Sequence, residues 1–368
     1  MDNLIFLILF FLSVINISIK GINDFFFDYM NLKNTNSIKG IFVWMIILSH
    51  YTGYYKENEK YIFKKILNSF GQKMVSLFLF YSGFGIYESI KKKGLNYVNK
   101  LPIKCIILLI KSQIILLFYL INNLILGIKI KLTDYFGSII FKSSIGNSNW
   151  FAFTIISLYF YSFISFKFVN CKLNYISIVI LSFICFLHIY LVYNYYYPKM
   201  RFTVDNILCF IIGFYHSLLI NKLNNIIMKN DIVYLGILSI LVSIYYYYYI
   251  YTNKTILIVS ITNSFFCLIV VFISLKIRFE NEFLRLLNTH SFSIYLLQRL
   301  VMRFIYFKKY FRYSNILRFF VEFILILLIS IIFDTYTTFI DKIFNKKNIE
   351  KPKVNFNIEE EKKIINLK

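Results

Sequence analysis

Long apolar runs separated by short polar or basic connectors follow one another along most of the chain. Most runs are about 17–26 residues long, which is the length an α-helix needs to cross the hydrocarbon core of a bilayer. The pattern therefore predicts eleven helices, with boundaries accurate to a few residues. Their expected ranges are 3–19, 37–51, 74–90, 103–128, 149–169, 174–193, 204–221, 231–251, 255–276, 289–307 and 316–340.

The first apolar run also fits the central part of a signal peptide. No basic segment precedes it, and no small-residue cleavage site closes it, so a retained helix is the preferred interpretation.

Composition indicates an integral membrane protein. Hydrophobic residues make up 58% of the 368 residues, charged residues make up 16%, and the mean hydropathy is +0.64. We therefore expect an all-α, polytopic integral membrane protein, because helices satisfy their backbone polar groups internally in lipid. The net charge of +23 does not indicate nucleic-acid binding, since the cations lie in short connectors where they set topology and meet membrane lipids. The five cysteines are scattered without metal-binding or disulfide spacing, so no metal site is expected.

Three parts follow from this pattern. Residues 1–33 form an N-terminal transmembrane helix and connector, residues 34–340 form the main transmembrane domain, and residues 341–368 form a charged cytoplasmic tail. The basic connector 91–104 is expected in the cytoplasm, which places the N-terminus outside and the C-terminus inside. The distribution of lysine and arginine between the two sides favours this orientation but does not determine it.

Within the second run, SIKGIFVWMIILSHY from Ser37 to Tyr51, a cation and a histidine bracket an apolar stretch. On a helix, Lys39 and His50 lie roughly 16 Å apart along the axis, about half the hydrocarbon thickness of a bilayer. A titratable imidazole at that depth indicates a functional site. The alternative is a histidine that bonds to a neighbouring helix or lies at the headgroup level.

Several motifs occur in an order that resembles the membrane-bound acyltransferase-3 family. The family's first core helix carries an arginine, ten residues and then a histidine; here lysine replaces the arginine at Lys39, and His50 keeps the spacing. The next helix ends its aromatic run with Ser82, Gly83 and Phe84, as the family's Ser-Gly-Phe does.

Later motifs extend the resemblance from about 34 to 339. NSNWFAF around Trp150 is similar to the family's Trp-Phe helix start, and NILCFIIGF around Gly213 is similar to its Phe-x-x-Gly helix. SFSIYLLQ resembles the late Ser-x-x-Tyr-Leu-x-His element through Tyr295, with Gln298 where histidine is usual.

This resemblance implies a ten-helix acyltransferase core with one added N-terminal helix, in a bacterial plasma membrane. Members transfer acyl groups, commonly acetyl from acetyl-CoA, to sugars of cell-surface or capsular polysaccharides, so the partners would be acyl-CoA, an extracytoplasmic glycan and lipid. No cofactor is bound permanently. His50 would be catalytic, either as a base or as an acyl carrier, and Lys39, Lys100 and Lys104 would meet the phosphates of the donor.

The resemblance also implies a tunnel for the acyl group. The expected lining residues are Ser82, Gly83, Phe84, Trp150, Tyr295 and Gln298. Another interpretation exists for Ser82, Gly83 and Trp150, since small residues allow helices to approach closely and tryptophan is common at membrane interfaces.

Two other functions are compatible with a polytopic membrane protein. A transporter or flippase for a polysaccharide or lipid-linked precursor would favour inverted repeats with broken helices, and only three prolines occur. A non-catalytic scaffold is disfavoured, because several charged or titratable residues within the apolar runs are costly in lipid without a polar interior. They are His50, Glu88, Arg299, Arg303, Glu322 and Asp334. We expect Arg303 and Glu322 to form a buried ion pair between the last two helices.

Overall fold

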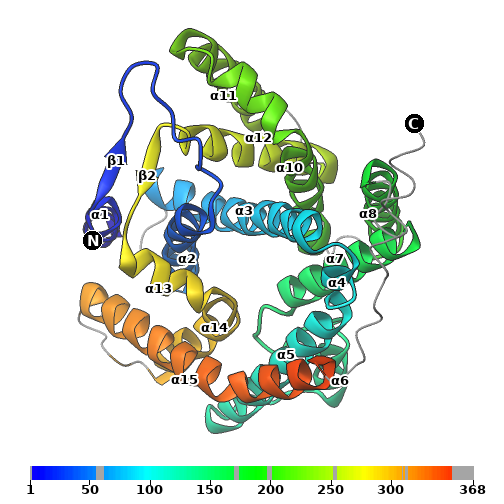
Figure 1. The fold of residues 1–368 in the computed structure, drawn as a ribbon. Coiled ribbons are helices and arrows are strands. Elements are labelled where there is room, and N and C mark those ends of the chain that lie inside the picture. Colours follow the sequence, from blue (N-terminus) through cyan, green and yellow to red (C-terminus); the bar gives the residue numbers. More distant parts are fainter. Residues whose placement is uncertain are drawn as a thin grey trace.

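Two helices, α2 (Leu32–Tyr54) and α3 (Ile62–Lys93), occupy the middle of the structure, and the other helices pack around them (Figure 1). The structure is a computed structural model that describes residues 2–54, 62–169, 174–196, 201–251, 255–308, 310 and 314–349. The remaining elements are α1 (Asp2–Val14), β1 (Ile17–Ile19), α4 (Leu95–Val98), α5 (Leu101–Ile125), α6 (Leu132–Ile139), α7 (Asn149–Phe168), α8 (Asn174–Tyr196), α9 (Arg201–Val204), α10 (Ile207–Ile227), α11 (Asp231–Tyr251), α12 (Ile256–Ile273), β2 (Ile277–Phe279), α13 (Glu282–Thr289), α14 (Ser291–Lys308) and α15 (Asn315–Ile349).

Each of the eleven predicted runs coincides with a helix, but fewer of them are apolar enough to be recognised as membrane spans. In the described part of the chain, seven helices meet that standard of length and apolarity, namely α4–α5, α7, α8, α10, α11, α12 and α15. The protein is thus a multi-pass membrane protein, and a count of eleven spans stays a prediction. Helices α2, α3 and α14 carry polar residues along their length because they form the interior of the bundle.

The N-terminal segment differs from the predicted helix over 3–19. Helix α1 ends at Val14, and residues 17–19 form strand β1, which pairs antiparallel with β2. Thirteen helical residues cover roughly 20 Å, which is shorter than the hydrocarbon core of a bilayer. At the other end of the chain, α15 continues beyond the predicted run 316–340 to Ile349, and Asp341 forms an ion pair with Lys111 at 3.0 Å.

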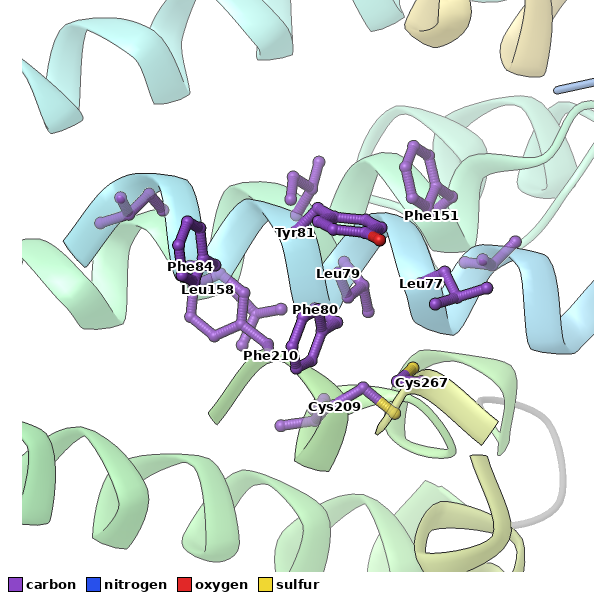
Figure 2. Close-up of a cluster of buried hydrophobic side chains, with 14 of the residues drawn as sticks. Leu77, Leu79, Phe80, Tyr81, Phe84, Phe151, Leu158, Cys209, Phe210 and Cys267 are labelled. Atoms are coloured by element: carbon purple, nitrogen blue, oxygen red, sulfur yellow. The ribbon is translucent and has the colours of Figure 1, made fainter. Parts of the chain in front are cut away.

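Helix α3 crosses α10 at very short range. A Cβ atom added at Gly83 would lie 2.2 Å from the carbonyl oxygen of Phe210, and one added at Gly213 would lie 2.2 Å from that of Phe80. Figure 2 shows Phe80 and Phe210 together on this side of α3, while Tyr81 points to the other side. The Ser-Gly-Phe and Phe-x-x-Gly motifs therefore supply the two glycines of one helix crossing.

A third glycine brings α2 against α13. A Cβ atom at Gly40 would lie 2.0 Å from the carbonyl oxygen of Leu284. This close approach explains the glycine that follows Lys39, because any side chain there would displace α13.

The polar connectors before α2 and after α10 and α12 meet at one end of the bundle. Arg278 forms an ion pair with Asp28, and Lys276 forms one with Asp231 at 2.6 Å. The Tyr29 hydroxyl donates to the Asn224 side-chain oxygen at 3.1 Å. Strands β1 and β2 lie at this end, which is also where α3 ends in Lys91, Lys92 and Lys93.

The predicted ion pair between Arg303 and Glu322 does not form. The Arg303 guanidinium instead donates to the carbonyl oxygen of Ile145 at 2.7 Å. Gly146 makes room for it, because a Cβ atom there would lie 1.8 Å from Nη1 of Arg303. The loop before α7 therefore takes the place that the prediction assigned to α15, where Glu322 is buried.

We predict that this end of the bundle faces the cytoplasm. On intact cells, a membrane-impermeant maleimide should label Lys129→Cys, beyond the far end of α5, and should leave Lys93→Cys unlabelled. Both positions are exposed, so both should be labelled after permeabilisation. Labelling of Lys93→Cys from outside would reverse the orientation.

Candidate active site

A cavity of about 940 Å³ extends inward from the end of the bundle where the polar connectors meet. Its outer part is lined by residues near helix ends, including Asn31, Glu88 and Asn288. Its inner part reaches Ile46 on α2 and Phe78 on α3, each roughly 20 Å along its helix from that end. The cavity is therefore long enough to admit an elongated ligand into the bundle.

One face of α2 forms a wall of this cavity. Thr35, Lys39, Val43 and Ile46 all line it, and they are spaced three or four residues apart. His50 is the next position on the same face, because 11 residues make just over three full helical turns. The Lys39–His50 spacing therefore points both side chains to one side of the helix, with His50 one turn beyond the lined part.

His50 differs from the other histidines in its hydrogen bonding. The rings of His216, His188 and His290 lie at 3.2 Å from the Tyr29 hydroxyl, 2.6 Å from the Tyr161 hydroxyl and 2.6 Å from the Asp334 carboxylate. Among the described residues, none forms a hydrogen bond with His50. Its imidazole is thus the one of these four that forms no hydrogen bond with a described side chain.

Arg299 on α14 is the charged neighbour of His50. It interacts electrostatically with His50 and also with Tyr119 and Tyr295. The Nε atom of Arg299 is buried and has no hydrogen-bond acceptor within the described residues. A buried guanidinium donor beside an imidazole can stabilise negative charge that develops on a bound group.

The lysines at the outer part of the cavity fall into two kinds. Lys91 is engaged, since it forms an ion pair with Glu88 and donates to the Ser217 carbonyl oxygen at 3.0 Å. Lys39 lines the cavity wall, and no hydrogen bond or ion pair joins it to another described residue. An ammonium group in that position is available to an anionic ligand.

A comparison with family models identifies the family of the chain. The family model for an acyltransferase domain, acyltransferase-3, matches residues 32–335, which is most of the chain. The protein belongs to the acyltransferase-3 family. Comparisons with the curated proteins and with the solved structures returned no match.

Most of the predicted tunnel residues of this acyltransferase line the cavity. They are Ser82, Phe84, Tyr295 and Gln298. The Ser82 hydroxyl donates to the Tyr159 oxygen at 3.3 Å, and the side-chain oxygen of Gln298 is buried without a partner among the described residues.

Two predicted lining residues pack between helices instead. Gly83 is outside the cavity lining and faces α10, where only a glycine fits against the Phe210 carbonyl. Trp150 begins α7 and packs edge-on against Tyr295, with ring centroids 6.0 Å apart. It thus supports the cavity wall from behind.

The predicted donor residues Lys100 and Lys104 lie beside a second cavity of about 560 Å³. This cavity shares Lys92 and Tyr97 with the large one, so the two adjoin. The Lys104 ammonium donates to the Tyr97 hydroxyl at 2.9 Å.

Sequence reasoning missed several residues of the acyltransferase site. Tyr81, Tyr97 and Tyr159 line the cavity, but the chain holds 31 tyrosines, so composition gave no reason to select them. Arg299 was expected as one of the charges that are costly in lipid, but its place beside His50 was not predicted.

Proposed function

We propose that this acyltransferase moves an acetyl group from acetyl-CoA to a sugar hydroxyl of a cell-surface or capsular polysaccharide or its precursor, in a bacterial plasma membrane. The donor enters from the cytoplasmic end of the large cavity, and the glycan approaches His50 from the opposite side. The acceptor class and the acetyl group come from the resemblance of the motifs to cell-surface O-acetyltransferases.

The arrangement of residues along one face of α2 supports this proposal most directly. Three of the cavity-lining residues on it lead from Lys39 inward, and His50 follows one turn later beside Arg299. A pantetheine arm is long and slender, so it suits a cavity that extends roughly 20 Å along two helices. Lys39 then meets donor oxygens while the thioester lies toward His50.

The chemistry requires a proton acceptor and a site for the oxyanion. His50 removes the proton from the sugar hydroxyl as the oxygen attacks the thioester carbonyl. The new carbon–oxygen bond forms, the carbon–sulfur bond breaks, and the proton passes to the leaving thiolate of coenzyme A. Arg299 stabilises the carbonyl oxygen while it carries negative charge. If His50 carries the acetyl group itself, the same cavity serves both half-reactions.

Radiolabelled acetyl-CoA tests the activity. Membranes that contain the protein should incorporate label into surface glycan, and membranes without it should not. Mass analysis of the polysaccharide should show a matching mass difference of one acetyl group. Transport of an unmodified glycan across the membrane without label incorporation would favour a transporter.

Replacement of Lys39 should affect donor use more than chemistry. Lys39→Ala should raise the KM for acetyl-CoA roughly tenfold with a smaller change in kcat, because one charge-assisted contact is lost. Lys39→Arg should retain the use of acetyl-CoA, since it keeps the positive charge and restores the bidentate guanidinium typical of the family. Lys33→Ala, an exposed lysine on the same helix that does not line the cavity, is the matched control. Equal KM values for Lys39→Ala and Lys33→Ala would remove Lys39 from the donor site.

A further inference from the structure

The second cavity carries a concentration of positive charge that the acyl-transfer chemistry does not use. Its lining consists of Lys92, Lys93, Asn96, Tyr97, Lys100 and Lys104. Four of these six residues are lysines, and none is acidic. Like charges gathered in one pocket repel one another, so a bound anion would stabilise the arrangement.

Local structure holds these lysines around the same space. Helix α3 ends at Lys93, Gly94 turns the chain with a φ of 53°, and the short helix α4 returns it toward α5. Lys100 directly precedes α5, and Lys104 lies one turn into it. The nearest acidic residue in the sequence, Glu88, is engaged with Lys91 and Ser217 on the side of the large cavity.

The position of this pocket suggests which anion it takes. Lys92 and Tyr97 belong to both cavities, so a ligand in the large cavity can extend a side branch into the lysine pocket. Coenzyme A has such a branch, because its ribose bears a 3′-phosphate monoester beside the pyrophosphate. A monoester carries close to two negative charges at neutral pH, which suits several lysines better than a neutral ribose hydroxyl would.

We propose that this lysine pocket binds the 3′-phosphate of the donor and thereby selects acetyl-CoA over acetyl-3′-dephospho-CoA. The proposal rests on the proposed function for the identity of the donor. The shared chemistry is phosphate recognition, and an anionic lipid headgroup is the other source of phosphate at this membrane surface.

The proposal is tested by measuring the binding of acyl-CoA donors to the purified protein in phosphatidylcholine nanodiscs. This measurement requires no glycan acceptor. The wild type should bind acetyl-3′-dephospho-CoA roughly tenfold or more weakly than acetyl-CoA. The double variant Lys100→Ala/Lys104→Ala should bind both donors alike, at the weaker level. The variant Lys129→Ala/Lys131→Ala removes two exposed lysines beyond the other end of α5 and should keep the wild-type preference.

Two further measurements keep the result interpretable. Lys100→Ala alone changes an exposed position and should lose part of the preference, even if the double variant folds poorly. Adenosine 3′,5′-bisphosphate should compete with acetyl-CoA better than adenosine 5′-monophosphate does in the wild type, and equally poorly in the double variant.

Several outcomes would overturn the proposal. Equal wild-type affinity for the two donors would do so, as would an undiminished preference in both Lys100→Ala and the double variant. The lysine substitutions could instead change the affinity for both donors equally, and only when phosphatidylglycerol is added. That result would assign the pocket to a lipid headgroup. If donors bind with the expected preference but no glycan is labelled in membranes, the proposed acceptor reaction fails while the phosphate site stands.

Discussion

His50→Ala should reduce acyl transfer by about 10²–10⁴-fold, the range that general acid–base catalysis contributes. The change removes the imidazole at the inner end of the α2 face, beside Arg299, and no described residue depends on that ring for a hydrogen bond. The variant should therefore insert and accumulate normally. Transfer of radiolabelled acetyl from acetyl-CoA into glycan is the measurement, at matched protein abundance.

His188→Ala is the control for this experiment. That ring bonds to the Tyr161 hydroxyl at 2.6 Å and lies outside the cavity lining, so transfer should continue at a rate close to the wild type. Wild-type transfer by well-expressed His50→Ala membranes would contradict the catalytic assignment, whichever of the two chemical roles His50 has.

Gly83→Ala should destabilise the protein strongly, although it adds a single methyl group. The new Cβ atom would lie 2.2 Å from the Phe210 carbonyl oxygen, so α3 and α10 would have to separate. Overpacking in a well-packed core typically costs about 1–3 kcal/mol, and a rigid backbone partner places this case toward the upper end. The loss should appear as a lower midpoint of thermal unfolding in detergent and as lower abundance in membranes.

Gly85→Ala is a closely matched control, because it makes the same substitution two residues later on the same helix. A Cβ atom there meets nothing within 4 Å. Its unfolding midpoint should equal or exceed that of the wild type, since alanine favours the helix more than glycine does. Equal midpoints for the two variants would show that α10 can move away from α3 without cost.

Hydrophobic patterning was sufficient to locate the long helices, because each predicted run overlaps with one. It did not indicate the short helices α4, α6, α9 and α13. It was insufficient at the N-terminus, where the apolar run 3–19 contains both α1 and strand β1. That strand depends on pairing with residues 277–279, a partner that is remote in sequence. Local periodicity contains no information about such a pairing.

Only the part of the candidate site that lies on a single helix could be predicted from residue spacing. The 11-residue separation of Lys39 and His50 places both on one face, as the structure has them. Arg299 comes from α14, and its position beside His50 depends on how α2 and α14 pack. For the same reason, the sequence could not show whether Gly83 faces the tunnel or a neighbouring helix, since both interpretations require a small residue.

The polar residues of α3 have a consequence for the synthesis of this protein. Near the end opposite the cavity entrance, Gln72 donates to the Asp205 carboxylate at 2.6 Å and Lys73 bonds to the Tyr245 hydroxyl. These partners lie 133 and 172 residues further along the chain, so they leave the ribosome on the order of ten seconds after α3 does. Until then the Gln72 side chain lacks this carboxylate acceptor, and an amide without a partner is costly in lipid. The stable insertion of helix α3 should therefore improve once the Asp205 connector before α10, and then α11, have joined the bundle.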